Sequence, residues 1–391
     1  MKFAAVLMCL LLAACGDGPA SQPESPVTRL AAGGWHSLAL RHDGSILAWG
    51  SNRNGRLGDA SAVDSAVPKS IDGGYASVAA GGNHTLAVGI DGRLWAWGYN
   101  GAGELGDGST SESLVPRLIG SRFSVVEAGF AHSVALDNDG RLWAWGDNFT
   151  GQLGDGTTAD AHTPKLIGSG YASVAAGGAE FLIGIRPVKR VSLAHTIAIR
   201  TDGSLWTWGY NQYGQLGNGS TTGTTIPALI GTGYAGVAAG GMHSLGLKTD
   251  GTLLAWGLNA SGQLGDGSTV DSSVPKVIGS GFAGVAAGDR HTIAIKTDGS
   301  VWTWGDNASG QLGDGTTLAS STPKRIGAGY VGVAAGGEHS LALRADGAVL
   351  AWGRNDLGQL GDGTLISRSN PVVAVPGVPG APSPPRTVGF R

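Results

Sequence analysis

The stretch from His291 to Gly305 reads HTIAIKTDGSVWTWG, and it decides the fold. Thr292–Lys296 and Ser300–Trp304 are short runs rich in β-branched and aromatic residues, and the pair Asp298-Gly299 lies between them. Such runs favour strands, and Asp-Gly between two of them is typical of a tight hairpin turn. The stretch therefore predicts two antiparallel strands joined by a turn.

The same pattern recurs seven times along the chain, with a Trp-Gly pair 13 residues after a histidine in each copy. The histidines are His36, His84, His132, His195, His243, His291 and His339. The tryptophans are Trp49, Trp97, Trp145, Trp208, Trp256, Trp304 and Trp352. Successive tryptophans are 48 residues apart, except for an interval of 63 between Trp145 and Trp208. Identical copies in these columns predict a structural role for both residue types within a repeat architecture.

Each unit also contains a strand-like run before its histidine, such as 330–334, and another after its proline, such as 275–278. Four short strands per unit, in seven units, predict an all-β fold, a seven-bladed β-propeller of four-stranded blades. On this count the first unit, beginning at 27–30, lacks a post-proline strand of its own, and the last unit ends with a spare one, 371–375. We therefore expect the ring to be closed by a C-terminal strand that completes the first blade.

Composition agrees with one large closed repeat structure and excludes some functions. Of the 391 residues, 70 are glycines without a Gly-X-Y period, so glycine is expected mainly in turns. Charged residues make up 14% and the net charge is −3, which argues against nucleic-acid binding because binders carry a basic excess.

The N-terminus has the pattern of an export signal. Lys2 precedes an apolar run, 3–14, that is too short to span a bilayer, and the run ends in Leu12-Ala13-Ala14-Cys15. This ending resembles the lipobox of bacterial lipoproteins, in which the cysteine is acylated and the peptide is cut before it. Lipidation at Cys15 is the expectation; the alternative is an ordinary secretory signal with an incidental cysteine.

The domain organisation follows from these boundaries. We expect a lipoprotein signal peptide over 1–14, a lipidated flexible tether over 15–28, the propeller over 29–375 and a proline-rich tail over 376–391. The protein is expected to be exported and lipid-anchored in the cell envelope. Gly16 after the cysteine indicates the outer membrane if the cell is Gram-negative.

The repeat resembles a known family. Units such as Val285-Ala286-Ala287-Gly288, followed by His291, Asp298-Gly299 and Trp304-Gly305-Asp306-Asn307, are similar to repeats of the regulator of chromosome condensation over about residues 29–375. The resemblance implies a seven-bladed propeller. The family's founder exchanges nucleotide on a small nuclear GTPase, but the wedge and contacts behind that activity have no match here. A secreted bacterial relative inhibits β-lactamases, which implies that the scaffold can serve purely for binding.

No chemistry is expected from the repeated residues. Each histidine is followed by Ser or Thr and precedes an Asp, which could suggest a hydrolase triad, but an active site is rarely needed seven times. One histidine per blade gives no pair at metal-ligand spacing, so neither metal nor cofactor is expected. The loop Gln263–Gly267 offers oxygen ligands for calcium but lacks the acidic pattern of a helix–loop–helix site. A structural loop is the favoured interpretation.

Function is expected where the repeat departs from its own pattern. The interval of 63 residues contains 15 extra residues within 179–194, including Phe181 and the basic run Arg186, Lys189, Arg190. A partial strand duplication and a protruding contact hairpin are both open interpretations. Near the loop asparagines, the departures are Tyr99, Phe149, Tyr210, Tyr213 and Leu258. These side chains either cap the blades or bind a partner.

Strand alternation places the insertion and the aromatic loops on one face, because loops one–two and three–four of an antiparallel blade emerge together. We therefore expect a non-catalytic protein-binding propeller with an unknown protein partner in the cell envelope. A glycan or cell-wall polymer is the alternative ligand, and an enzyme is not expected. We also expect a monomer.

Overall fold

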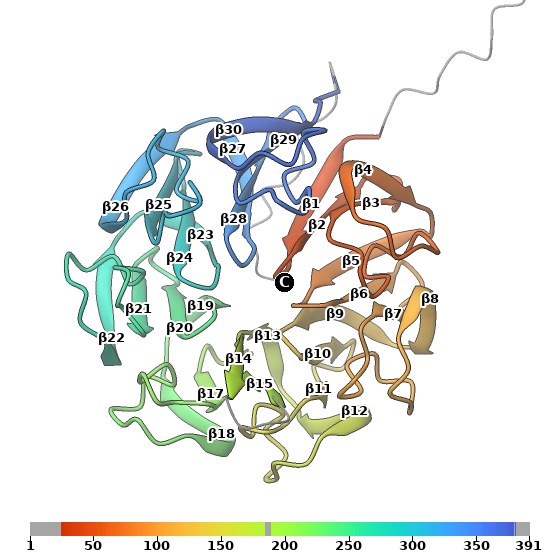
Figure 1. Ribbon diagram of the computed structural model, residues 1–391. Coiled ribbons are helices and arrows are strands. Elements are labelled where there is room, and N and C mark those ends of the chain that lie inside the picture. Colours follow the sequence, from red (N-terminus) through yellow and green to blue (C-terminus); the bar gives the residue numbers. More distant parts are fainter. Residues whose placement is uncertain (1–24, 184–188, 379, 381–391) are drawn as a thin grey trace, which may run out of the picture.

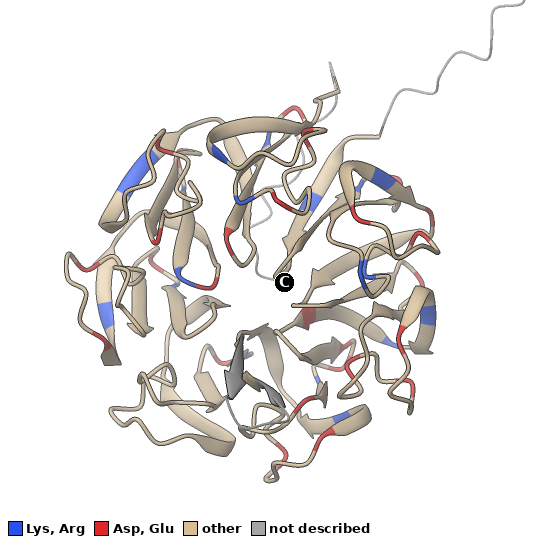
Figure 2. Ribbon diagram, viewed as in Figure 1, with Lys and Arg blue, Asp and Glu red and all other residues tan. Residues whose placement is uncertain are grey.

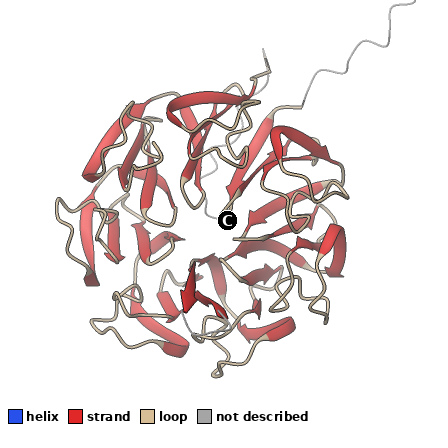
Figure 3. Ribbon diagram, in the orientation of Figure 1, coloured by secondary structure: helices blue, strands red, loops and turns tan. Residues whose placement is uncertain are grey.

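The computed structural model describes residues 25–183, 189–378 and 380, and the side chains of 180–191 are left undescribed. Within these ranges every regular element is a strand, as Figure 3 shows. The predicted signal peptide, Cys15, Arg186 and most of the tail therefore lie outside the described residues. Twenty-eight strands form seven four-stranded antiparallel sheets around a central axis, and the remaining two form a separate hairpin (Figure 1). The predicted fold class is confirmed.

Each blade uses four consecutive repeat strands, named here first to fourth from the axis outward. The first strands are β1 (Val27–Ala32), β5 (Tyr75–Ala80), β9 (Phe123–Ala128), β13 (Tyr171–Ala176), β19 (Tyr234–Ala239), β23 (Phe282–Ala287) and β27 (Tyr330–Ala335). The second strands are β2 (His36–Arg41), β6 (His84–Gly89), β10 (His132–Asp137), β16 (His195–Arg200), β20 (His243–Lys248), β24 (His291–Lys296) and β28 (His339–Arg344).

The outer half of each blade has the same regularity. The third strands are β3 (Ile46–Gly50), β7 (Leu94–Gly98), β11 (Leu142–Gly146), β17 (Leu205–Gly209), β21 (Leu253–Gly257), β25 (Val301–Gly305) and β29 (Val349–Gly353). The fourth strands are β4 (Ser65–Ile71), β8 (Ser113–Gly120), β12 (Ala161–Gly168), β18 (Thr224–Gly231), β22 (Ser272–Gly279), β26 (Ser320–Gly327) and β30 (Arg368–Val375). The extra hairpin is β14 (Ala179–Ile183) and β15 (Lys189–Leu193).

The backbone requires glycine after the tryptophan that recurs in each repeat. Gly305 has φ of 103°, a value that side-chain-bearing residues avoid, and a Cβ there would lie 2.5 Å from the Arg290 carbonyl oxygen. The Asp-Gly turn has the same requirement, since Gly299 has φ of 79°. These two positions explain why Trp-Gly and Asp-Gly persist in every unit.

The core lies between the blades. Trp304 is fully buried, and it packs with Leu253, Ala255 and Leu264 of the preceding blade. Its indole Nε1–H donates to the Gln263 carbonyl oxygen of that blade at 2.9 Å. Because each blade covers its neighbour in this way, the blades are stable only in a ring.

The predicted closure of the ring is wrong. β30 pairs with β29 of its own blade, Val349 opposite Val375, and the first blade has its own post-proline strand in β4, Ile46 opposite Ile71. The proline strand comes last in each unit, so Pro68 belongs to the first blade and no strand is spare. Pairing a strand with its neighbour in sequence needs only a local loop, which favours this arrangement.

The seam between the seventh and first blades is closed by side chains and loops. Trp49 Nε1 donates to the Gln359 carbonyl oxygen at 2.9 Å, and the Gly337 amide donates to the Gly33 carbonyl at 3.2 Å. A buried cluster that contains Val27, Leu341 and Val375 spans both blades. The seam therefore repeats the interface found between other blades.

Candidate functional site

The seven repeat histidines form a continuous ring of hydrogen bonds. Each Nε2 lies 2.8–3.0 Å from the Ser or Thr hydroxyl that follows the histidine of the next blade. At the seam, His339 contacts Ser37 at 2.8 Å, so the ring has no gap. All seven histidines are buried. The predicted structural role of the histidine and tryptophan columns agrees with this geometry.

Hydrogen bonds and burial together fix the protonation state of these histidines. The Ser340 hydroxyl donates to the Gln311 carbonyl oxygen at 2.9 Å, so it must accept its bond from Nε2–H of His291. The Nδ1 atom is then unprotonated, and it is buried with no partner among the described residues. Burial lowers the pKa of six histidines to about 3 or 4 and that of His36 well below its ordinary value. The imidazoles are neutral spacers between the blades.

A serine–histidine–aspartate triad does not assemble. Asp298 lies in the turn at the other end of its strand, where its Oδ1 accepts from the Ser300 amide at 2.9 Å. His291 reaches the hydroxyl of Ser340, whereas Asp298 bonds only within its own turn among the described residues. The histidine–hydroxyl pairs therefore have a structural explanation.

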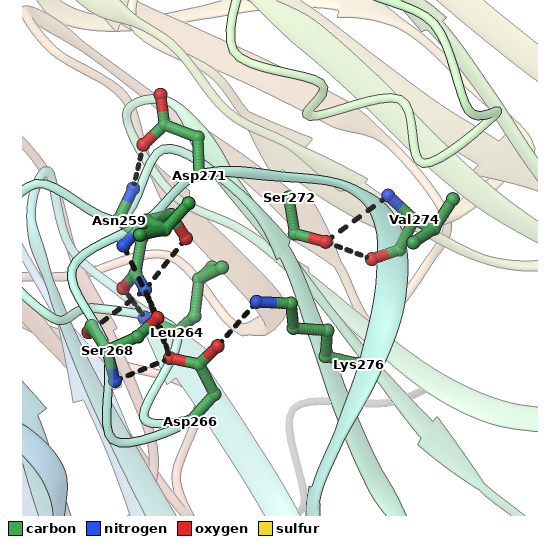
Figure 4. Close-up of polar contacts among 9 residues, drawn as sticks. Asn259, Leu264, Asp266, Ser268, Asp271, Ser272, Val274 and Lys276 are labelled. Atoms are coloured by element: carbon green, nitrogen blue, oxygen red, sulfur yellow. Dashed lines mark hydrogen bonds and ion pairs between the residues drawn. The ribbon is translucent and has the colours of Figure 1, made fainter.

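The Asn-to-Asp loop is held by its own side chains, as Figure 4 shows for the fifth blade. Asn259 accepts from the Leu264 amide at 2.9 Å and donates to Asp266 at 3.1 Å. Lys276 donates to the other Asp266 oxygen at 2.6 Å. Partial burial opposes ionisation, but Lys276 and Ser268 lower the pKa of Asp266 to about 2. The oxygens considered for calcium are thus occupied by donors of the protein.

The same ion pair recurs around the ring. Figure 2 shows basic residues on the fourth strands beside acidic residues of the loops. Lys165–Asp155 and Lys324–Asp314 have separations of 2.5 and 2.7 Å. Such pairs fasten the loops of six blades to their own outer strands, whereas the fourth blade has Asn218 and Ala228 at the two positions.

A cavity of about 1060 Å³ with exposed aromatic side chains is formed by loops of the seventh, first, second and third blades, together with Ser192 of the insertion in the fourth blade. We call it the loop-face cavity. Its aromatic lining consists of Trp35, Tyr99, Phe130 and Phe149. Its charged lining consists of Arg53, Arg56, Glu104, Asp147, Asp160, Arg354 and Asp356. The lining thus combines aromatic side chains with many charged groups, and polar groups that converge on a hollow can orient a bound ligand.

The structure brings some of the predicted aromatic residues together. Tyr99 and Phe149 are 40% and 47% exposed and line the loop-face cavity. Phe149 and Tyr210 line a second hollow of about 270 Å³, and Tyr213 packs edge-on against Tyr210 with ring centroids 6.4 Å apart. Leu258 is half-buried and lines neither hollow.

The insertion forms a hairpin outside the blade. β14 pairs with β15, with Phe181 opposite Val191, Leu182 opposite Arg190 and Ile183 opposite Lys189, while β13 pairs directly with β16. The insertion is therefore a hairpin that adds no strand to the blade, and its role in binding stays a prediction. Ser192 at the base of the hairpin lines the loop-face cavity, which joins the insertion to Tyr99 and Phe149.

Three further cavity residues were not singled out from the sequence. Arg56 and Glu104 occupy the column that holds glutamine in the other five blades. Trp35 is the only tryptophan outside the third strands. A column-by-column comparison of the repeats contains all three signals.

Trp35 is held in place by the seventh blade. The Arg354 guanidinium lies over its ring, 5.0 Å from the centroid. Arg354 is itself paired with Asp356 at 2.7 Å and Glu338 at 3.3 Å. The lining of the cavity therefore crosses the seam of the ring.

Metal-ligand clusters and membrane-spanning helices are both absent from the described part of the chain. No group of three His, Cys, Asp or Glu side chains there could hold a metal ion. Also within those residues, no helix is long and apolar enough to cross a membrane.

Sequence comparison defines the class of protein. The model of the family described as the RCC1-like domain matches residues 16–278 and 189–385, and the chain belongs to this family. Short stretches are similar to the protein RCC2 of Homo sapiens, 46% identical over 52 residues, and of Mus musculus, 51% identical over 37 residues. These stretches cover 12% and 10% of this chain, and only 10% and 7% of the relatives.

Solved structures have the same fold. Human WBSCR16 aligns with a TM-score of 0.73 and 23% identity, over 85% of this chain and 94% of that one. Prp20p from Saccharomyces cerevisiae aligns with a TM-score of 0.70 and 24% identity, over 84% and 85% of the two chains. Yeast RCC1 (Prp20) bound to Kap60 gives 0.73 and 21%, over 95% and 91%.

Proposed function

We propose that the protein is a non-catalytic binding module that takes a segment of a partner protein into the loop-face cavity. The observation that carries the proposal is the gathering of Trp35, Tyr99, Phe130 and Phe149 around one hollow of about 1060 Å³. Phe130 stands where four other blades have glycine, and Trp35, Tyr99 and Phe149 stand in columns that vary between blades, whereas the residues that hold the blades together are repeated. Aromatic side chains in such hollows dominate binding energy.

Relatives support a protein as the ligand. The yeast structure of Prp20p was described together with its binding to Gsp1p and histones, and yeast RCC1 was solved bound to Kap60. The sequence identity between this chain and these two structures is below 25%. We therefore do not transfer the partners of those proteins to this chain. The shared property is the use of the propeller as a binding scaffold.

The binding proposal is tested by replacing Tyr99→Asp, Phe149→Ala, Tyr210→Asp and Tyr213→Ser, each residue taken from a matching position of another repeat. Residues 16–391 serve as bait for a pull-down from cell envelopes, and captured proteins are identified by mass spectrometry. The variant should melt close to wild type but lose at least about 30-fold in affinity for a captured protein, because one anchor is worth about 2 kcal/mol.

The matched control lies on the opposite face. Arg93 and Arg141 lie in the turns between second and third strands, and their replacement by Ser should leave affinity unchanged. Loss of binding in this control alone would put the site on the other side of the ring. Retained binding in the aromatic variant, or binding only to soluble glycans on an array, would overturn the proposal.

We also propose that the module is displayed on a membrane surface of the cell envelope through lipid on Cys15. Several acyl chains on one residue exceed what stable anchoring needs. The Cys15→Ser protein should leave the membrane fraction or remain unprocessed, and labelled palmitate should no longer be incorporated. Membrane association as firm as wild type after a high-salt wash would contradict the anchor.

A further inference from the structure

Arg56 is the least satisfied charged side chain of the loop-face cavity. It is only 2% exposed, yet its Nε has no hydrogen-bond partner among the described residues. Nη1 donates to the Gly82 carbonyl at a long 3.4 Å, and Nη2 donates to Asn54 Oδ1 at 3.2 Å. A buried guanidinium normally has an anionic or several good neutral acceptors, so this arrangement is costly.

The repeat shows that the fold does not need an arginine there. In the matching position Gln263 accepts from the Ser261 amide at 2.9 Å, and the same bond recurs at Gln152, Gln311 and Gln359. A guanidinium has no acceptor, so Arg56 cannot make this bond. Arg56 therefore gives up a structural hydrogen bond that other blades keep.

Positive charge is concentrated in the part of the cavity that the first blade forms. Arg53, from the same loop, is exposed and also lines the cavity. Among the described residues neither guanidinium forms an ion pair. Burial lowers the pKa of Arg56 to about 10, with Asp64 opposing and Arg53 reinforcing the shift. Asp64 is the carboxylate that raises the pKa of Arg56, and it already accepts a hydrogen bond from the Asn52 amide at 2.6 Å.

The side of the cavity formed by the second and third blades has the opposite charge, from Glu104, Asp147 and Asp160. Glu104 is 1% exposed and accepts from the Ala102 amide at 2.9 Å, so it retains the loop bond of the glutamines. Burial first, and then Asp147 and Asp160, raise the pKa of Glu104 to about 7. An anion is repelled from this end and is directed to the first blade.

We propose that the first-blade end of the loop-face cavity is a carboxylate-binding subsite, where Arg56 and Arg53 receive an Asp, Glu or C-terminal carboxylate of the partner segment. This inference rests on the proposed function and deepens it. Trp35 and Tyr99 flank the subsite and provide apolar contact for the residues next to the carboxylate. Arginine suits this ligand because its planar fork matches a carboxylate.

The test uses a displayed library of random peptides selected on the folded protein. Selected sequences should share an acidic residue at one position. The tightest peptide is then synthesised with capped ends, as the acid and as its Asn or Gln analogue, and titrated by calorimetry. On wild type the amide analogue should bind at least 10-fold more weakly than the acid.

Two matched variants locate the effect. Arg56→Gln restores the residue of five other blades, should melt at or above the wild-type temperature, and should bind acid and amide peptides within 2-fold of each other. Glu104→Gln, the same change at the opposite end, should keep the 10-fold preference. Arg56→Lys, which retains charge without the fork, should keep only part of it. Inorganic phosphate alone should compete weakly, since it lacks the apolar contacts.

The outcomes separate the two proposals. Selected peptides without a common acidic residue, or an acid preference that persists in Arg56→Gln, would overturn the subsite and leave the cavity as a peptide site. Failure to select any peptide that depends on Tyr99 and Phe149 would overturn both. Phosphate binding as tight as the acidic peptide would replace the carboxylate with a general oxyanion.

Discussion

The melting temperature should fall steeply as the pH is lowered from 7.5 to 5.5, because the interfaces between blades contain seven neutral, buried histidines. An unfolded histidine titrates near about 6.5, whereas burial holds the pKa of six of them at about 3 or 4 in the folded protein. Below the unfolded pKa the unfolded chain therefore binds protons that the folded chain does not. This stabilisation is complete above about pH 6.5 and is lost as the pH falls toward the folded pKa.

Three carboxyl groups act in the opposite direction. Burial is the main cause in each case, and it raises the pKa of Glu104 to about 7, of Glu127 to about 8 and of Asp289 to about 6. They add stability as the pH falls through those values toward their unfolded pKa. Seven histidines outweigh three carboxyls, so unfolding near pH 5.5 should take up roughly four protons, each worth about 1.4 kcal/mol per pH unit.

Calorimetry at several pH values measures this proton uptake. His291→Gln should reduce it by one. His42→Asn and His162→Asn are the controls, because both side chains are exposed and outside the ring. A melting temperature that is constant between pH 7.5 and 5.5 would show that the histidines are not neutral spacers.

Trp49→Ala and Trp256→Ala should destabilise the protein equally, by about 3–5 kcal/mol each. Both indoles are fully buried, and both donate to a loop carbonyl of the preceding blade at 2.9 Å. Trp49 lies at the seam between the last and first blades, and Trp256 lies at an ordinary interface. Equal loss is expected because the two interfaces have the same contacts.

Guanidinium unfolding monitored by circular dichroism provides the comparison. Trp95→Ala, a half-buried tryptophan of the third strand, is the control and should cost less. A much smaller loss for Trp49→Ala than for Trp256→Ala would mean that the seam contributes little, and that the ring is held by something other than repeated side-chain contacts.

The strands could be predicted because each one pairs with the repeat strand next to it in the sequence. Asp-Gly turns, Trp-Gly pairs and prolines each occur once per unit, so seven copies reinforce one interpretation. The closure was predicted wrongly because the phase of a repeat is ambiguous in sequence. Pro68 could be assigned to the end of the first unit or to the start of the second, and only its pairing with β3 decides.

The candidate site was predictable only in part. Tyr99 and Phe149 stand out as aromatic residues in two variable columns of the repeat. Strand alternation places both on the same face as the insertion. Arg56 and Glu104 were overlooked because they lie inside a motif whose other residues are constant, and Trp35 because it precedes a repeated histidine. The cavity itself depends on how loops of four blades meet, which no single repeat encodes.

The hairpin of the fourth blade leaves the pairing of its host unchanged. Ala176 lies opposite Thr196 in that blade, just as Ala239 lies opposite Ser244 in the next, despite the 15 additional residues between the strands. The connection between the first and second strands is thus an insertion site, which accepts additional residues without altering the ring. The other six blades have the equivalent connection around the axis. Evolution, or protein engineering, can therefore add a new binding surface by lengthening any one of these loops.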